Sequence, residues 1–270
     1  MKPIRAFSKF LYYYLQIDII RRVISFDIQS SKFFVNKKSV TKNNLFTIGN
    51  LPTLNKDFCL LFAATPDYIY TFLPRLIEQL KVSNSFGNTD LIVGVITNSK
   101  HEREELENVF LDVKFVGIFP HFNNNKSSKN CARFLLVQKL IQTGITAPIL
   151  VADIDIFINS NLNEFIQNYN NINGLKLRRG WDVRFYCFAG CLFLNSENRQ
   201  LIIDDLCERI RKRFHTKNWY TDQISLWFTY KKFSKSFSVL TETEFSIKTK
   251  TAIIYAYKGK NKPKLIKDGI

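Results

Sequence analysis

The sequence predicts an α/β fold in which a mostly parallel sheet carries helices on both faces. From Asp57 onward, short apolar runs typical of buried strands alternate with stretches of helical period. The first run, residues 58–64, is continuously apolar, which is typical of a strand covered on both faces. The chain has 270 residues, 46% of them apolar, which is enough for one domain with a full core.

The elements can be assigned in order from these local patterns. Strands are expected at 58–64, 90–97, 113–119, within the run 147–158, and at 187–195. Helices are expected from about Asp67, over 101–110, from Ser128 or Asn130, around 203–210, and from near Asp222. Residues 161–173 are rich in asparagine and are expected to form a loop.

The first 56 residues differ from the rest, so we predict an extension at 1–56 ahead of a single domain at 57–270. Residues 7–17 carry aromatic and aliphatic side chains at helical spacing, flanked by basic residues. Two interpretations remain open: a helix docked on the core, or an interfacial helix on an anionic membrane. Residues 36–56 are polar and turn-rich and are expected to form a connector.

Charge and cysteine content narrow the class of protein. The net charge of +16 would attract polyanions, but no nucleic-acid-binding motif is present, and we predict no nucleic-acid partner. No apolar stretch is long enough for a membrane-spanning helix. The five cysteines form an odd set without a Cys-x-x-Cys pair, so we expect them reduced and buried. We therefore predict a cytoplasmic protein, with peripheral contact at the inner face of the membrane as an alternative.

Two aspartates interrupt the apolar run at 147–158. In a strand, Asp153 and Asp155 would point to the same side, so both carboxylates could converge on one cation. Hard oxygen ligands favour Mg²⁺ or Mn²⁺. Acidic residues near the carboxyl end of a central strand lie where an open α/β sheet binds its ligand, and a divalent ion there would hold a diphosphate.

The two aspartates belong to one of six short segments with a recognisable order. The segments are Phe62-Ala-Ala-Thr-Pro-Asp-Tyr68, Asn130-Cys-Ala-Arg-Phe-Leu135, Asp153-Ile-Asp155, Phe188-Ala-Gly-Cys-Leu-Phe-Leu-Asn195, Trp219-Tyr-Thr-Asp-Gln-Ile-Ser-Leu226 and Ala256-Tyr-Lys-Gly-Lys-Asn-Lys-Pro263. In this order they resemble the GT-A class of nucleotide-sugar glycosyltransferases. The resemblance is greatest to retaining family 8, which includes bacterial lipopolysaccharide galactosyl- and glucosyltransferases and glycogenin. It implies a GT-A fold with a Rossmann-like sheet.

The resemblance implies nucleotide-binding roles for the first segments and the last. Tyr68 would stack on uracil, and Asp67 would help to read the nucleoside, while Ala63 lies in the same opening segment. Arg133 would lie beside the donor sugar or its phosphates. Lys262 would bind the diphosphate.

The remaining segments are implied to hold the metal and the sugar. Asp153 and Asp155 would bind Mn²⁺ or Mg²⁺, and Gly190 would line the sugar pocket. Asp222 would contact the donor sugar, and Gln223 would lie next to the anomeric carbon.

The sequence departs from the family pattern twice. Phe188 stands where the family has a sugar-binding Asn, and Ala256 stands where it has a metal-binding His. The ion would then have two protein carboxylates, with the diphosphate and water completing its coordination.

The resemblance implies a metal-dependent glycosyltransferase that moves a sugar from a UDP-sugar to a glycan or lipid-linked acceptor, as in lipopolysaccharide biosynthesis. Retention is expected if family 8 is the right branch, whereas an inverting enzyme would use Asp222 as its first candidate base. Two other classes remain: a degenerate module that binds nucleotide sugar without turnover, motivated by Phe188 and Ala256, and a basic membrane-surface adaptor, motivated by the charge.

Overall fold

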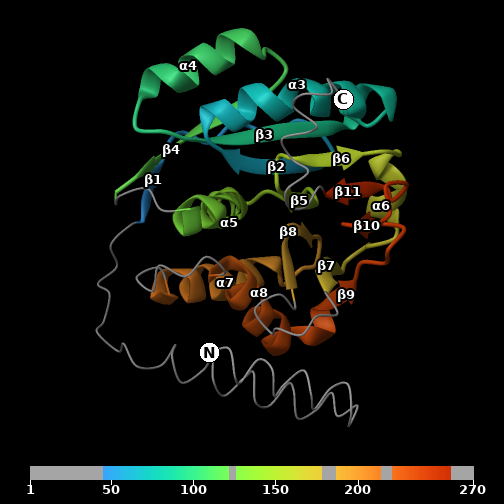
Figure 1. The fold of residues 1–270 in the computed structure, drawn as a ribbon. Coiled ribbons are helices and arrows are strands. Elements are labelled where there is room, and N and C mark those ends of the chain that lie inside the picture. The colour runs from blue at the N-terminus through green and yellow to red at the C-terminus, as the bar shows by residue number, and fades with distance from the viewer. Residues whose placement is uncertain (1–44, 122–125, 178–186, 214–220, 257–270) are drawn as a thin grey trace, which may run out of the picture.

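The computed structural model describes residues 45–121, 126–177, 187–213 and 221–256 (Figure 1). Within these ranges, no helix has the length and apolar character needed to cross a membrane. The N-terminal aromatic stripe and Lys262 lie outside the described residues, so membrane contact and the diphosphate lysine stay predictions.

The central feature is an eight-stranded sheet of mixed direction, with strand order β1-β4-β3-β2-β5-β8-β7-β9. Four neighbouring strands are parallel: β4 (Lys114–Pro120), β3 (Thr89–Ile96), β2 (Phe58–Ala64) and β5 (Ile149–Ala152). The remaining strands extend the sheet on both sides: β1 (Phe46–Ile48) antiparallel to β4, β8 (Cys187–Leu194) antiparallel to β5 and to β7 (Asn173–Leu177), and β9 (Phe237–Val239) parallel to β7.

Helices cover both faces of this sheet (Figure 1). One face carries α3 (Pro66–Val82) and α4 (Lys100–Val109), and the other carries α5 (Lys126–Gln142), α7 (Arg199–Arg213) and α8 (Thr221–Lys232). A second sheet of three strands lies beside the first: β10 (Phe245–Ser246), β11 (Ile254–Ala256) and β6 (Ile156–Ile158). The short elements are α6 (Leu162–Gln167) and two 3₁₀ turns, η1 (Phe86–Asn88) and η4 (Ser234–Ser236).

The alternation of side chains along β2 builds two apolar layers, one on each face of the sheet. Cys59 and Leu61 pack in the layer that contains α5, whereas Phe58, Leu60 and Phe62 pack in the layer that contains α3. Successive side chains of a strand point to opposite faces, so a strand buried on both sides must be apolar throughout. This explains why the run 58–64 lacks polar alternation.

The α/β fold class is confirmed, and most predicted elements are present with small changes of boundary. All five cysteines are free and buried, as expected.

Three local predictions were wrong. The asparagine-rich segment contains α6, because Leu162 and Phe165 are buried and Asn161 accepts a hydrogen bond from the Asn163 N–H as an N-cap.

The second correction concerns the connector, since Phe46–Ile48 form an edge strand on β4. Leu45 and Phe46 are buried there, and apolar burial of this kind holds a chain segment on a domain.

The third correction concerns the acidic motif. β5 ends at Ala152, and Asp153, Ile154 and Asp155 form a turn that leads into β6 of the second sheet. Contrary to the prediction, the two carboxylates therefore do not lie on the same side of one strand. The turn still places both carboxylates at the edge of the large sheet where its parallel strands end, which is the edge where the sequence predicted a bound ligand.

Candidate functional site

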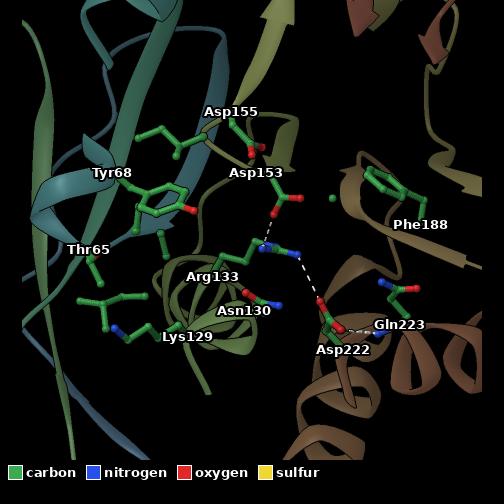
Figure 2. Close-up of a pocket in the computed structure, with 15 residues that line it drawn as sticks. Thr65, Tyr68, Lys129, Asn130, Arg133, Asp153, Asp155, Phe188, Asp222 and Gln223 are labelled. Carbon is green, nitrogen blue, oxygen red and sulfur yellow. Dashed lines mark hydrogen bonds and ion pairs between the residues drawn. The ribbon is translucent and has the colours of Figure 1, made fainter. Parts of the chain in front are cut away.

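A pocket of about 390 Å³ opens at the edge of the sheet where the parallel strands β2, β3 and β5 end (Figure 2). The carboxyl ends of parallel strands meet at one edge, so residues far apart in the sequence converge there. The antiparallel β8 contributes its amino end, α5 contributes residues of its amino-terminal half, and α8 contributes its first turn. The size suits a small-molecule ligand.

One side of the pocket presents an aromatic ring. Tyr68 lies in the first turn of α3 and is 48% exposed, with its ring against Phe72 at 5.5 Å between centroids. Thr65, Lys129 and Asn130 line the pocket on the same side (Figure 2). An exposed aromatic face beside such polar groups suits a flat base that stacks and forms hydrogen bonds.

The turn Asp153-Ile154-Asp155, here called the acidic turn, lines the pocket. Its backbone is tied to β8, because the Asp153 N–H donates to the Gly190 carbonyl at 3.1 Å. The Asp153 side chain is 37% exposed, whereas Asp155 is 4% exposed, and both line the pocket. One carboxylate is thus open to a ligand while the other is largely enclosed.

Arg133 joins the acidic turn to the start of α8. Its Nη1 donates to Asp153 Oδ1 at 2.6 Å, and its Nη2 donates to the Ala189 carbonyl at 2.9 Å and lies 3.4 Å from Asp222 Oδ2 (Figure 2). The residue is only 4% exposed, and its Nε is buried without a partner among the described residues. A planar guanidinium can serve several acceptors at once, which suits a buried cation between two carboxylates.

Asp222 is a buried carboxylate at the start of α8. Burial raises the pKa of its carboxyl to about 6, and the Arg133 guanidinium opposes that rise. The Gln223 backbone N–H donates to Asp222 Oδ1 at 2.8 Å and also favours the charged form, whereas the charge of Asp153 disfavours it. The group thus titrates close to neutral pH, as functional carboxyls often do.

Gly190 allows the acidic turn and an aromatic ring to meet over one backbone position. A Cβ added to Gly190 would lie 2.5 Å from Asp153 Oδ2 and 2.4 Å from Phe188 Cε1. Real Cβ atoms do not approach other atoms so closely, so a larger residue would displace one of these groups. A glycine is therefore needed for the observed position of the Asp153 carboxylate.

The structure brings most of the predicted site residues together in this one pocket. Those that line it are Ala63, Tyr68, Arg133, Asp153, Asp155, Gly190, Asp222 and Gln223. Asp67, which is exposed on the first turn of α3, does not line the pocket. Sequence reasoning did not assign roles to Thr65 and Lys129, which adjoin matched residues at the starts of α3 and α5.

The metal ligands can be tested against the described residues. Among them, no group of three His, Cys, Asp or Glu side chains is placed to hold an ion. Ala256, at the expected position of a third ligand, pairs with Ile156 across β11 and β6 and is 2% exposed. Among the described residues, the pocket thus offers two hard carboxylates, Asp153 and Asp155, and oxygen donors of this kind suit Mg²⁺ or Mn²⁺ when a ligand supplies further oxygens.

No protein-family model matches the chain, and no curated protein matches it in a sequence comparison. Solved structures do match. The galactosyltransferase LgtC, solved in complex with donor and acceptor sugar analogues, has a TM-score of 0.55 at 16% identity, over 76% of this chain and 88% of LgtC. The chain has a GT-A-like glycosyltransferase fold.

Two further glycosyltransferases share this fold. The bifunctional glycosyltransferase WbbM matches with a TM-score of 0.56 at 14% identity, over 80% of this chain and 48% of WbbM. GlyE of Streptococcus pneumoniae TIGR4, in its apo form, matches with a TM-score of 0.51 at 16% identity, over 77% of this chain and 56% of GlyE. The glycosyltransferase fold of this chain thus agrees with the resemblance found in its sequence motifs.

Proposed function

We propose that this protein is a glycosyltransferase that transfers a sugar from a UDP-sugar to a glycan or lipid-linked acceptor, with retention at the anomeric carbon. The observation that carries the proposal is the convergence of Tyr68, Arg133, Asp153 and Asp222 on one pocket of a glycosyltransferase fold. The pocket presents an aromatic ring, Tyr68, at one end and a cation among carboxylates in its middle (Figure 2). This polarity suits a nucleoside joined to a diphosphate sugar.

Asp153 and Asp155 would hold a divalent ion, Mn²⁺ or Mg²⁺. Such an ion supplies positive charge to the leaving diphosphate. Asp153 is paired with Arg133 in the structure, so the same carboxylate would serve both cations. With two carboxylates from the described residues, we expect weak metal binding alone and tighter binding once UDP supplies oxygens, and this coupling must be reciprocal.

The residues of the chain have separate roles in the proposed reaction. Arg133 stabilises negative charge on the leaving diphosphate and holds Asp153 and Asp222 in place. Asp222 and Gln223 stabilise the positive charge that develops on the sugar ring. The acceptor hydroxyl attacks the face from which the diphosphate leaves, and the departing phosphate oxygen takes its proton.

Asp222 is better suited to electrostatic stabilisation than to the role of general base for inversion. Its two oxygens are engaged by Gln223 N–H and by Arg133, and its side chain is only 5% exposed. A general base must reach the proton that it removes. The contacts of Asp222 therefore support the retaining alternative.

Titration calorimetry of the full chain with UDP, with and without Mn²⁺, tests the proposal. We expect UDP to bind at least about 10-fold more tightly with Mn²⁺, the lower range of common coupling energies. Donor hydrolysis in Mn²⁺ should then separate an enzyme from a binding module. Absence of UDP binding would refute the proposed function, while binding without turnover would favour the degenerate module.

A further inference from the structure

Arg133 occupies the carboxylate that the proposed metal ion would need. Its Nη1 donates to Asp153 Oδ1 at 2.6 Å, a short distance typical of strong charge-assisted hydrogen bonds. Asp153 is the open carboxylate of the acidic turn, whereas Asp155 is largely enclosed. A guanidinium and a metal ion on one carboxylate repel each other, because both are positive. The ion pair between Arg133 and Asp153 therefore opposes metal binding.

A second carboxylate is already within reach of the same guanidinium. Arg133 Nη2 lies 3.4 Å from Asp222 Oδ2, and Figure 2 shows the guanidinium between the two aspartates. Hydrogen bonds between ions of this kind are usually about 2.7–2.9 Å long, so the contact with Asp222 has room to shorten. The bond from Nη2 to the Ala189 carbonyl, at 2.9 Å, lies at the same nitrogen and can serve as a pivot.

The hydrogen bonds of Arg133 are incomplete in the metal-free arrangement. Its Nε is buried and has no hydrogen-bond partner among the described residues, and the whole residue is only 4% exposed. A buried donor without an acceptor costs free energy. A turn of the guanidinium away from Asp153 therefore does not disrupt a fully satisfied network.

We propose that Arg133 and the metal ion exchange at Asp153. When Mn²⁺ or Mg²⁺ binds, the Arg133 guanidinium leaves Asp153 Oδ1 and pairs closely with Asp222. Asp222 is then a positioning residue for the metal site, because it accepts the cation that the ion displaces. This inference rests on the proposed function and goes beyond it, since it identifies a residue that sets metal affinity without being assigned as a ligand.

Electron paramagnetic resonance of free Mn²⁺, titrated with the full chain in the absence of nucleotide, measures the exchange. The buffer is kept at about pH 7.5, above the pKa of about 6 of the Asp222 carboxyl. Arg133→Met removes the competing cation and should raise the affinity for Mn²⁺ by about 10-fold. Asp222→Asn removes the charge of the alternative partner and should lower that affinity by about 10-fold. An Arg133→Met protein with wild-type affinity would overturn the inference.

The double variant separates exchange from a simple effect of charge. If Asp222 acts through Arg133, adding Asp222→Asn to Arg133→Met should change the affinity for Mn²⁺ by less than about 2-fold. A loss of the same factor in both backgrounds would overturn the inference. The double variant also removes the buried carboxylate that Arg133→Met leaves unpaired. If Arg133→Met alone does not fold, the double variant should still bind Mn²⁺ about 100-fold more tightly than Asp222→Asn, and equal affinities would overturn the inference.

The matched control is Lys129→Met. Lys129 lines the pocket on the Tyr68 side and lies four residues before Arg133 on α5, so its loss changes the charge of the pocket equally but leaves the ion pair intact. The affinity for Mn²⁺ should stay within about 2-fold, because solvent and salt screen charges that are not in contact. A 10-fold rise would show that net charge sets the affinity and would overturn the inference.

The outcome for the proposed function is read separately, from the wild-type chain. If this chain binds neither UDP nor Mn²⁺ when both are present, the proposed function falls. If it binds both, but the affinity for Mn²⁺ is the same with and without the Arg133 guanidinium, only the present inference falls.

Discussion

Replacing Gly190 with alanine should disable the site through a single methyl group. The added Cβ would lie 2.5 Å from Asp153 Oδ2, 2.4 Å from Phe188 Cε1 and 2.8 Å from Phe188 Cζ. Ordinary contact distances require these neighbours to move by roughly 0.5–1 Å. The Phe188 ring must shift although Phe245 lies behind it, and the Asp153 carboxylate must move away from its own contact with the added Cβ.

The expected magnitude follows from that displacement. A shift of about 1 Å in a catalytic group can lower the rate about 100-fold. We therefore expect Gly190→Ala to reduce Mn²⁺-dependent donor hydrolysis by about 100-fold. The same overpacking should lower the free energy of unfolding by about 1–3 kcal/mol, which leaves the protein folded at room temperature.

The assay measures donor hydrolysis in Mn²⁺ beside thermal unfolding followed by circular dichroism. Gly87→Ala is the matched control, since a Cβ at Gly87 in η1 meets no atom within 4 Å. It should keep both activity and thermal midpoint. A Gly190→Ala protein that hydrolyses the donor at the wild-type rate would refute the argument that this glycine sets the position of Asp153.

Three further changes test other parts of the structure. Asp155→Ala should lower metal-dependent turnover by about 100-fold or more with the fold intact, and full activity in Mn²⁺ would rule out Asp155 as a metal ligand. The pKa of the Asp222 carboxyl is about 6 in the folded state against an ordinary 3.8. Below pH 4 the group is protonated in both the folded and the unfolded state, so the shift has no effect on stability there. Between pH 4 and pH 6 the unfolded state loses the proton first, which increasingly destabilises the folded state. In metal-free buffer, Asp222→Asn should therefore gain on the order of 3 kcal/mol relative to wild type between pH 4 and pH 7, and a pH-independent difference in denaturant unfolding would contradict this. Phe193→Ala, at a fully buried ring that contacts Phe58 and Phe165, should cost about 3–5 kcal/mol, and a loss below about 1 kcal/mol would show that this layer is not tightly packed.

Local patterns were sufficient for most elements of the fold. The continuous apolar run 58–64 predicted a strand covered on both faces, and it is β2. The helical period after Asp67 likewise predicted α3, whose buried face includes Phe72, Leu73, Leu76 and Leu80. Such patterns can be interpreted because the apolar or polar character of each residue indicates whether its side chain faces the core.

Short polar segments were harder to assign. Residues 161–173 read as a loop by composition, but α6 forms there because tertiary contacts bury two apolar side chains. The sequence also did not indicate that β8 is antiparallel to β5, since a buried apolar strand has the same residue pattern in either direction. Local composition carries no information on such pairings.

For the site, the sequence by itself determined which residue types were available and their order, including Tyr68, Arg133, the two aspartates of the acidic turn and Asp222. Only the tertiary structure decided their relations. Arg133 bridges Asp153 and Asp222 across 20 and 89 residues of chain, and the pKa of Asp222 depends on burial by elements distant in sequence. Electrostatic and packing energies depend on distance in space, which the order of residues does not contain.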